Sequence, residues 1–501
     1  MPDQLHHYIG GERVAGTSGR FGDVFDPATG EVTALCPYAS AAEVADAVAV
    51  ATEAGRAWAR ASIATRLEVI FNFRNEFIAA RDPLAQAISR EHGKTLGDSH
   101  GELGRALEAI EFACSMPQLT KGEYSLNIGG AIDNYSVLQP LGVVGCIAPF
   151  NFPAMVPLMM ATMAVAVGNA VILKPSERVP SAALQLGELW TKAGLPAGVW
   201  NVVNGDREAV EAIVAHPGIA AVSFVGSTKV AESVYQEGCR HNKRVMAFGG
   251  GKNHMIVMPD ADLDLVADHF VGAGYGSASQ RCMALSLAVP VGARTADALV
   301  ERLIPRIEAL RIGPYHDAAS DFGPLITRQA QQSVARAVEE GIAQGARVRV
   351  DGRGKAVAGY ENGFFVGSTL LDDVTPEMAF YKDEVFGPAR GIVRAGDVAE
   401  AIRLVNEHEL GNGVAIFTRD GHAARRFFED VDVGMIGINV PVPVPAGYHN
   451  FGGLKRSKFG EGYLFGPDAV RFYTKIKTMS ARWPEPKETA DGAGLTMPTN
   501  T

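Results

Sequence analysis

Short apolar stretches alternate with amphipathic ones from about residue 142 onward. Short apolar runs bounded by Gly, Pro or Asn are typical of buried strands, and apolar positions three and four apart are typical of helices. The strand-like stretches are VVGCIAP, AVILKP, VWNVVNG and AAVSFVG, with SAALQLGELWTKAG and REAVEAIVAHPG as helices between them. This alternation predicts βαβ units and a parallel sheet. A second alternating series, from about residue 253 to 439, predicts a second α/β domain.

The first part of the chain has strand and helix patterns of its own. YIGGERV and FGDVFDPATGEV alternate strand-like residues with Gly and Asp-Pro turns. A long helix follows, whose apolar face is formed by Val44, Val48, Ala51, Ala54 and Trp58. Further helical patterns run through the sixties to eighties and over about 101–116.

One uncharged stretch, from Met155 to Leu173, is long enough to resemble a membrane span. Pro157, Gly168 and Asn169 interrupt it. We therefore expect a buried helix, a Gly-Asn turn and a buried strand, and no membrane partner.

The C-terminal part is predicted to hold a last strand and a tail. The segment DAVRFYTKIKTMSARW, residues 468–483, looks like a terminal strand. The remainder, PEPKETADGAGLTMPTN, is polar and rich in Pro, Gly and Thr. Disorder is therefore expected over residues 485–501.

The net charge and the cysteine content argue against nucleic acid and metal ions as partners. The 501 residues carry a formal net charge of −10, which would repel a phosphate backbone, so nucleic acid is not an expected partner. The five cysteines are scattered and form no CxxC pair, so neither zinc nor disulfides are indicated, and no metal is expected. Reduced thiols, and an N-terminus without a cationic head or apolar core, fit a cytoplasmic protein.

Two strand ends offer candidate nucleotide contacts, although no GxGxxG motif follows any predicted strand. Lys174 and Glu177, in KPSE, follow the strand AVILK, at the sheet edge where parallel sheets bind ligands. A glutamate beside the ribose 2′ position would repel a 2′-phosphate and favour NAD over NADP. Gly226 and Ser227 begin a predicted helix, whose free N–H groups suit a pyrophosphate. Taken alone, KPSE also fits a surface turn and GST an ordinary helix cap.

Cys282 is the candidate nucleophile. It lies in SASQRCMALSLAVPVG, in a loop of small residues before an apolar strand. The adjacent Arg281 is a cation that can favour the reactive thiolate. The alternative is a buried structural cysteine.

Five ordered motifs resemble the aldehyde dehydrogenase superfamily: PFNFP (149–153), KPSE (174–177), FVGST (224–228), QRCMA (280–284) and EVFGP (384–388). The spacing agrees over nearly the whole chain. Within the superfamily the sequence looks most similar to the CoA-acylating methylmalonate-semialdehyde dehydrogenases, through stretches such as GGKNHMIVMPDAD, INVPVPVP and RFYTKIKT.

The resemblance implies a role for each matched residue. Cys282 would attack the aldehyde, and the Asn151 amide with the Cys282 backbone N–H would form the oxyanion hole. Glu384 would hold the nicotinamide ribose, with Phe386 beside the ring, and Phe150 also belongs to the cofactor site. The adenine ribose and pyrophosphate contacts would fall to the KPSE and GST residues named above.

Position 248 departs from the hydrolytic members of the superfamily. Their ELGGK segment carries a glutamate that activates water, whereas this chain reads Phe248-Gly-Gly-Gly-Lys252. A phenylalanine there argues against general-base hydrolysis and for transfer of the acyl group to coenzyme A. CoA-acylating relatives commonly have asparagine at this position, so Phe248 is unusual even among them.

Two arginines are associated with recognition of the substrate carboxylate in the methylmalonate-semialdehyde branch. Arg281 matches one of them and Arg105, in ELGRALEAIEFAC, the other. The alternative for Arg105 is a solvated helix face. The implied activity is NAD-dependent oxidation of malonate or methylmalonate semialdehyde, with decarboxylation, to acetyl-CoA or propionyl-CoA. A hydrolytic aldehyde dehydrogenase and a non-catalytic protein on the same fold are the alternatives.

The resemblance also implies a domain plan. A Rossmann-like NAD-binding domain would comprise residues 1–122 and 141–248, and the catalytic domain residues 249–445. A small β oligomerisation element would comprise 123–140 and 446–484. Assembly into a homodimer or homotetramer is expected through this hairpin and the C-terminal strand.

Overall fold

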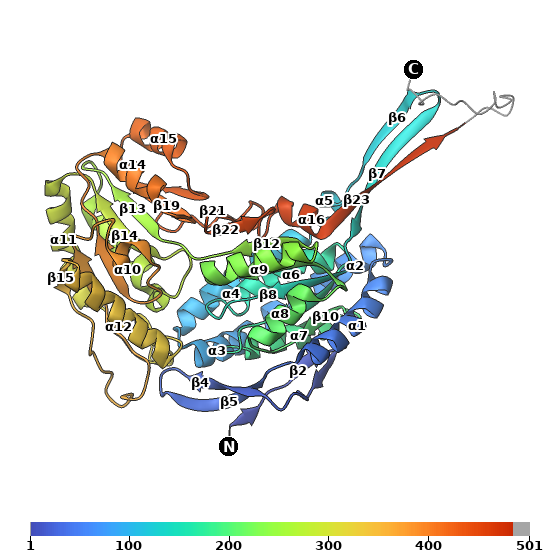
Figure 1. Ribbon diagram of the computed structural model, residues 1–501, viewed down its shortest axis with the longest axis horizontal. Coiled ribbons are helices and arrows are strands. Elements are labelled where there is room, and N and C mark those ends of the chain that lie inside the picture. Colours follow the sequence, from blue (N-terminus) through green and yellow to red (C-terminus); the bar gives the residue numbers. More distant parts are fainter. Residues whose placement is uncertain (1, 484–501) are drawn as a thin grey trace.

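The computed structural model describes residues 2–483. Two α/β units lie side by side, each built on its own sheet, and a narrow β arm projects from the first of them (Figure 1). The two-domain α/β architecture predicted from the sequence is therefore confirmed. The expected tail, 485–501, lies outside the described residues.

The sheet of the first unit has the strand order β22-β12-β11-β8-β9-β10-β2-β3. Its strands are β2 (His7–Ile9), β3 (Glu12–Val14), β8 (Val143–Ile147), β9 (Ala170–Lys174), β10 (Trp200–Val202), β11 (Ile219–Val225), β12 (Arg244–Phe248) and β22 (Lys458–Gly460). The strands from β12 to β10 are parallel, as the alternating pattern predicts. Antiparallel strands close both edges.

Helices cover both faces of this sheet. They are α1 (Ala41–Trp58), α2 (Ile63–Ala79), α3 (Arg81–His92), α4 (Leu96–Ala113), α5 (Met116–Leu119), α6 (Met155–Ala166), α7 (Ser181–Lys192), α8 (Arg207–Ala215) and α9 (Thr228–Arg240). Val143 and Ile147 of β8 join the core under α1, α8 and α9. Val144 and Cys146 of the same strand join the core under α2 to α4, α6 and α7, so both faces are buried.

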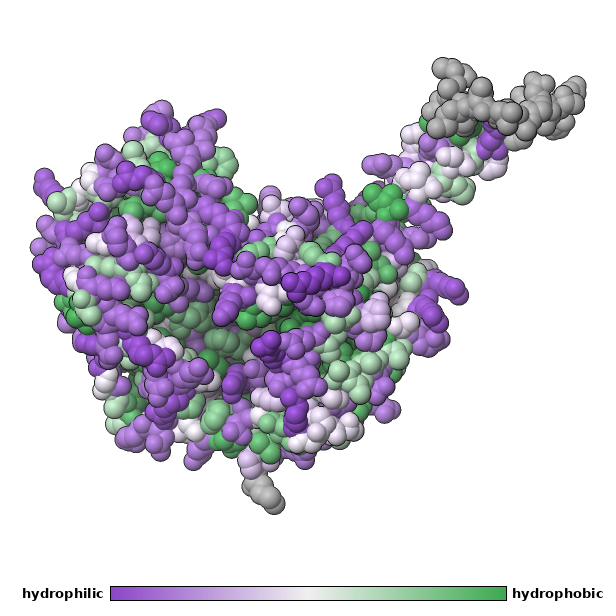
Figure 2. Space-filling model, viewed as in Figure 1, coloured by the Kyte–Doolittle hydropathy of each residue, from purple (hydrophilic) through white to green (hydrophobic). Residues whose placement is uncertain are grey.

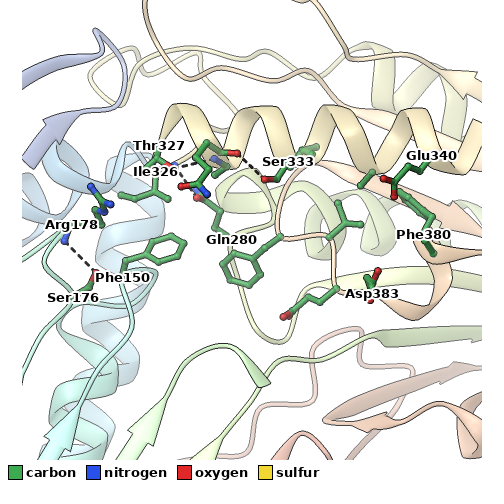
Figure 3. A pocket seen from close by; sticks show the side chains of 18 of the residues that line it. Phe150, Ser176, Arg178, Gln280, Ile326, Thr327, Ser333, Glu340, Phe380 and Asp383 are labelled. Carbon is green, nitrogen blue, oxygen red and sulfur yellow. Dashed lines mark hydrogen bonds between the residues drawn. The ribbon is translucent and has the colours of Figure 1, made fainter. Parts of the chain in front are cut away.

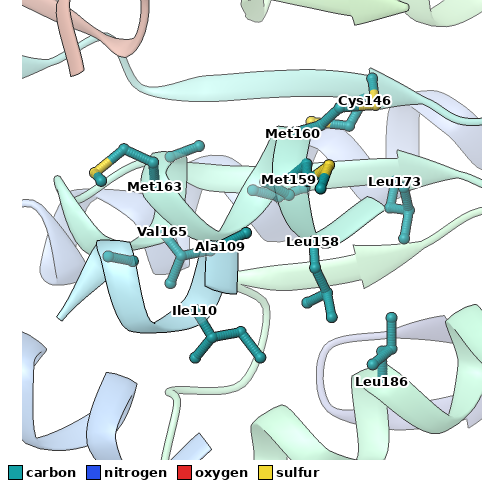
Figure 4. Close-up of a cluster of buried hydrophobic side chains, with 14 of the residues drawn as sticks. Ala109, Ile110, Cys146, Leu158, Met159, Met160, Met163, Val165, Leu173 and Leu186 are labelled. Atoms are coloured by element: carbon teal, nitrogen blue, oxygen red, sulfur yellow. The ribbon is translucent and has the colours of Figure 1, made fainter. Parts of the chain in front are cut away.

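Helix α6 is the buried helix predicted from the uncharged stretch. Its methionines, among them Met160 and Met163, pack in the cluster that also holds Ile110 of α4 and Leu186 of α7 (Figure 4). The Gly-Asn turn and strand β9 follow, as expected. No helix among the described residues is long and apolar enough to cross a membrane.

The second unit is built on the sheet β15-β16-β17-β14-β13-β19-β20. Its strands are β13 (Asn253–Val257), β14 (Leu285–Pro290), β15 (Arg347–Val350), β16 (Thr369–Asp372), β17 (Ala389–Ile392), β19 (Gly413–Phe417) and β20 (Met435–Ile438). Its helices are α10 (Leu263–Tyr275), α11 (Ala293–Glu308), α12 (Arg328–Ala343), α13 (Ala379–Lys382), α14 (Val398–Glu407) and α15 (Gly421–Asp430). The strands from β16 to β20 are parallel, so this sheet also matches the second alternating series.

The projecting arm is a three-stranded sheet of order β23-β7-β6. Strands β6 (Glu123–Gly129) and β7 (Ile132–Pro140) form a hairpin. Strand β7 also pairs along its length with β23 (Thr474–Arg482). Large apolar side chains on the arm face solvent, including Leu126, which is 74% exposed, and Ile476, which is 71% exposed. Two smaller sheets complete the fold: β1 (Asp3–Gln4) with β5 (Glu31–Pro37) and β4 (Phe21–Asp26), and β18 (Leu410–Gly411) with β21 (Leu454–Lys455).

The prediction of a single strand over residues 468–483 is wrong in its first part. Helix α16 (Pro467–Tyr473) comes first, and β23 begins only at Thr474. Gly466 adopts a left-handed φ of 86°, and the proline after it suits the first turn of a helix. Val470 and Tyr473 are then buried in the core that contains α6, and this burial favours the helix.

The expected oligomerisation segment, residues 446–484, contributes to two parts of the fold. Its strand β22 pairs with β12 at the edge of the first sheet. Its strand β23 belongs to the projecting arm. The domain boundaries remain a proposal, with 458–473 better placed beside the first unit.

Candidate active site

Cys282 lines a cavity of about 400 Å³ whose walls come from both units. Helices α4 and α6 contribute from the first unit, and the segment around Cys282 contributes from the second. Most of the wall is apolar, with Phe152, Met155 and Phe451 among its residues. On the face drawn in Figure 2 the surface is mostly hydrophilic, and hydrophobic residues gather in the hollow between the units.

Two asparagines fix the backbone of the nucleophile loop. The carbonyl oxygen of Cys282 accepts hydrogen bonds from Nδ2 of Asn253, at 2.9 Å, and from Nδ2 of Asn412, at 3.0 Å. Asn253 begins β13 and Asn412 precedes β19, the strand beside it. The sheet of the second unit therefore holds the cysteine in place, at the entrance to β14 as the sequence predicts.

The thiol of Cys282 is not activated by its neighbour in sequence. Burial raises the pKa of Cys282 to about 12, and the carboxylate of Glu384 acts in the same direction. The Arg281 guanidinium donates instead to Asp98 on α4. The expectation that Arg281 favours the thiolate is therefore wrong: the pKa of the thiol is raised, and Arg281 is paired with Asp98 across the cavity.

A second cavity, of about 510 Å³, adjoins the first through shared loops. Phe150 lines the second cavity and Phe152 the first, while Gln280 lines the second and Cys282 the first. Figure 3 shows this second cavity along helix α12, with Phe150 and Gln280 toward the end of the helix where Thr327 lies. The loops PFNFP and QRCMA thus separate a nucleophile chamber from a chamber large enough for a second ligand.

The residues proposed for the cofactor line this second cavity in part. Glu177 lines it, and its carboxylate lies 3.0 Å from Nζ of Lys174. Burial acts to raise the pKa of Glu177, but Lys174 and a backbone N–H outweigh it, so the pKa lies below its ordinary value and the carboxylate is anionic. Phe386 also lines the cavity, with its ring edge-on to that of Phe150 at 5.9 Å.

Gly226 and Ser227 directly follow β11, which pairs with β8 in the sheet of the first unit. Ser227 is the N-cap of α9 and makes no side-chain capping bond, so the first N–H groups of this helix are not capped by it. Neither residue is among those that line the second cavity. Their pyrophosphate role is consistent with the free helix end and stays a prediction.

Glu384 lines the second cavity. Its Oε1 accepts from the Gly251 N–H at 3.1 Å, and its charge is close enough to influence the Cys282 thiol. Burial raises the pKa of Glu384 to about 7. The buried ammonium of Lys252 donates to the carbonyl oxygens of Phe380 and Asp383, at 2.5 and 2.7 Å, which fixes the segment leading to Glu384.

A buried ion pair anchors the loop of Asn151. Nζ of Lys94 lies 2.8 Å from the Glu102 carboxylate and donates to the backbone oxygen of Asn151 at 2.6 Å. The other Glu102 oxygen accepts from the Ala154 and Met155 N–H groups, at 2.9 and 3.0 Å. These are N–H groups at the start of α6, which a carboxylate stabilises. Asn151 itself is buried, and its amide makes no side-chain hydrogen bond within residues 2–483.

Both candidate carboxylate-binding arginines line the nucleophile cavity. Arg105 is not a freely solvated helix residue: it lies 2.8 Å from Glu108 and also donates to the carbonyl of Pro445. Arg281 is paired with Asp98. The structure therefore brings the two arginines to one cavity with Cys282, each already held by an acidic partner on α4.

Phe248 ends β12 in the core of the first unit, with its ring 6.3 Å from that of Phe451. Its carbonyl accepts from the Gly226 N–H at 3.0 Å. Phe451 lines the nucleophile cavity, so Phe248 packs beside a residue of the cavity wall, in apolar surroundings.

Sequence reasoning missed the residues that hold the site together. Lys94, Asp98, Glu102 and Glu108 all lie in or just before α4. Charges that recur along one helix in this way are typical of an exposed helix face. One weak signal indicated that some of these charges are buried. The lysine in EHGKT follows a glycine, and a glutamate comes after it in a helix with an apolar stripe.

These features define a class of protein: two α/β units with a cysteine nucleophile loop between them and a dinucleotide-sized cavity beside it. The aldehyde dehydrogenase family matches residues 14–479. The chain belongs to this family.

Several of its relatives are semialdehyde dehydrogenases. The chain is 52% identical to the malonate-semialdehyde dehydrogenase of Pseudomonas aeruginosa, over 96% of this chain and 97% of that protein. It is 42% identical to the human mitochondrial acylating methylmalonate-semialdehyde/malonate-semialdehyde dehydrogenase, over 98% and 92% of the two chains. Among solved structures, a protein from Sinorhizobium meliloti, described as a methylmalonate-semialdehyde dehydrogenase and complexed with NAD, matches with a TM-score of 0.96 and 51% identity, over 97% of this chain and 99% of that chain.

Proposed function

We propose that this protein is a CoA-acylating, NAD-dependent dehydrogenase of malonate semialdehyde or methylmalonate semialdehyde, forming acetyl-CoA or propionyl-CoA with loss of carbon dioxide. The observation that carries the proposal is the chamber of Cys282, which combines two arginines with an apolar wall that includes Phe451, beside which Phe248 is buried. The names of the relatives point to the same substrates.

The carboxylates of Glu177 and Glu384, which line the second cavity, are suited to binding the two riboses of a dinucleotide. Glu177 is anionic and paired with Lys174, so the two side chains would hold the adenine ribose and disfavour a 2′-phosphate. Glu384 would hold the nicotinamide ribose beside Phe386. Bound there, NAD would supply the hydride acceptor.

The first chemical step belongs to Cys282. After the thiol has lost its proton, the thiolate sulfur forms a bond to the aldehyde carbon, and the carbonyl electrons move onto oxygen, where the Asn151 amide and the Cys282 N–H would stabilise the negative charge. Loss of hydride from that carbon restores the carbonyl as a thioester on Cys282. The Lys94–Glu102 pair contributes by holding the Asn151 loop.

Decarboxylation follows from the substrate's own chemistry. The bond between the α-carbon and the carboxylate breaks, and its electron pair is delocalised into the thioester carbonyl, so carbon dioxide leaves and the α-carbon then takes a proton. The thioester is attacked by a thiolate more readily than by unactivated water. Phe248 cannot activate water, so CoA is the expected acceptor.

Rapid mixing with malonate semialdehyde and NAD tests this function. Without CoA, we expect one equivalent of NADH per active site followed by a slow phase. Adding CoA should restore fast turnover and give acetyl-CoA, identified by mass spectrometry. Fast multiple turnover without CoA, with a free acid as product, would show a hydrolytic enzyme instead.

The arm gives a proposal for assembly. Its exposed apolar side chains lie on the hairpin, on β23 and just after it: Tyr124, Leu126, Val137, Ile476, Met479 and Trp483. Covering such a surface favours association between copies of the chain. We infer a homodimer or homotetramer, which analytical ultracentrifugation of the whole chain and of Leu126→Asp would test.

A further inference from the structure

The polar side chains that line the nucleophile cavity are almost all engaged already. Within the described part of the chain, every charged side chain of this wall is in an ion pair. The pairs are Lys94–Glu102, Arg281–Asp98 and Arg105–Glu108. A substrate carboxylate that enters the cavity must therefore share its arginines with carboxylates of the protein.

Ser277 is the exception in the wall. It lines the same cavity, is 2% exposed, and its hydroxyl has no hydrogen-bond partner among the residues described. Buried hydroxyls are normally paired, and leaving one unpaired destabilises the folded state. A ligand group at this place would complete the hydrogen bonding of the serine.

The backbone around Ser277 is held in an unusual conformation. Ser277, Ala278 and Ser279 have φ values of 54°, 50° and 60°, three successive left-handed residues that are not glycine. The Gln280 N–H closes this turn on the Ser277 carbonyl at 3.0 Å, and the Gln280 side chain accepts from the Ile326 N–H at 3.0 Å. Strained turns of this kind persist where surrounding contacts hold them, and they concentrate at functional sites.

We propose that the hydroxyl of Ser277 donates a hydrogen bond to the carboxylate of the aldehyde substrate, making Ser277 a specificity-determining residue. The inference rests on the proposed function, since it requires a carboxylated aldehyde in the cavity of Cys282. Ser277 differs from the arginines because no carboxylate of the protein competes for its donor. An aldehyde without a carboxylate leaves the hydroxyl unpaired, so the serine also selects against neutral substrates.

The test measures kcat/KM for malonate semialdehyde and for propanal, and takes their ratio. Ser277→Ala should lower the ratio about 10- to 100-fold, the effect of losing a hydrogen bond to a charged group, and most of the change should lie in KM for malonate semialdehyde. Ser277→Gly should lower it by a similar factor although it relieves the left-handed strain. Ala278→Gly, which relaxes the same turn without removing a polar group, should leave the ratio where it is.

Three outcomes distinguish a failure of this inference from a failure of the proposed dehydrogenase function. If Ser277→Ala keeps the wild-type ratio, the serine does not read the carboxylate and the inference is wrong. If Ala278→Gly changes the ratio as much as Ser277→Ala, the backbone of the turn is responsible and the inference is also wrong. If wild-type enzyme shows neither CoA-dependent turnover nor a preference for malonate semialdehyde, the proposed function itself fails.

Discussion

The guanidinium of Arg281 lies against Gly276, in space that any other residue would fill with its side chain. A Cβ on residue 276 would come within 2.7 Å of Nη1 and 2.9 Å of Cζ of Arg281. The backbone does not require glycine here, since Gly276 has φ −51° and ψ 140°, which every residue adopts. The glycine therefore serves to seat the arginine.

Gly276→Ala should weaken recognition of carboxylated aldehydes. The added methyl group displaces the flexible end of Arg281 and leaves the fold intact, so KM for malonate semialdehyde should rise about 10- to 100-fold, as for a lost charged hydrogen bond. Steady-state kinetics with malonate semialdehyde and propanal measure the change. The control is Gly272→Ala, because a Cβ at this exposed position of α10 meets nothing within 4 Å. Equal losses for the two aldehydes would contradict a role for Gly276 in seating Arg281.

The strands and most helices could be predicted from the sequence, whereas contacts between distant residues could not. Buried parallel strands such as β9 and β11 are nearly continuous apolar runs, so their pattern is visible locally. Helix α16 was missed because PDAVRFY is too short to show a helical period, and its burial against α6 depends on residues 300 positions away in the chain, such as Met163. Cofactor and nucleophile candidates were found through motifs that adjoin predicted strands.

The ion pairs of the site could not be read from local patterns. Arg281 and Asp98 are 183 positions apart, and Arg105 meets a carbonyl 340 positions away. The sequence shows the arginine beside the cysteine and suggests that it favours the thiolate. Only the fold reveals that the Arg281 guanidinium is paired with the Asp98 carboxylate. The hydrogen bond from Lys94 that anchors the Asn151 loop is likewise visible only in the fold.

The high pKa of Cys282 predicts how its reactivity depends on pH. Burial and Glu384 keep the thiol protonated at neutral pH, so inactivation by iodoacetamide without NAD should accelerate about tenfold per pH unit from pH 7 to 9, following the thiolate fraction. Glu384→Gln removes the negative charge that Glu384 carries above its pKa of about 7, so it should lower the pKa of Cys282 and raise the rate most at pH 8 to 9. Cys282→Ala corrects for labelling of the exposed Cys239. A rate that is constant above pH 6 would instead reveal a thiolate already formed.

The Lys94–Glu102 pair should be essential for both stability and the oxyanion loop. Lys94→Met leaves the buried Glu102 carboxylate without its cation, which should lower the free energy of unfolding by about 3–5 kcal/mol, because an uncompensated charge remains in the core. The Asn151 carbonyl also loses its donor, so the NADH burst should slow. Urea denaturation and rapid mixing measure the two effects.

A double substitution and an exposed pair serve as controls for Lys94. Lys94→Met/Glu102→Gln removes both charges and should recover part of the lost stability. Arg56→Met breaks a pair with Glu53 whose side chains are 72% and 83% exposed, and it should leave the urea midpoint nearly unchanged. If Lys94→Met and Arg56→Met behave alike, the buried pair has no special role.

The last prediction concerns Phe248 and the fate of the thioester. Phe248 is 3% exposed and packs near Phe451, so a glutamate introduced there would be desolvated and its pKa raised well above the ordinary value. Phe248→Glu should therefore remain protonated near neutral pH and leave the slow phase without CoA almost as slow as in the wild type. As pH rises through the raised pKa, the carboxylate forms and can accept a proton from water, so the slow phase should accelerate in this variant. The slow phase of NADH formation, followed from pH 6 to 9, measures this dependence, and Phe248→Leu, which keeps the site apolar, is the control. Fast CoA-independent turnover by Phe248→Glu at pH 6 would mean that position 248 is hydrated, and its apolar surroundings would then not explain why acyl transfer to CoA is favoured over hydrolysis.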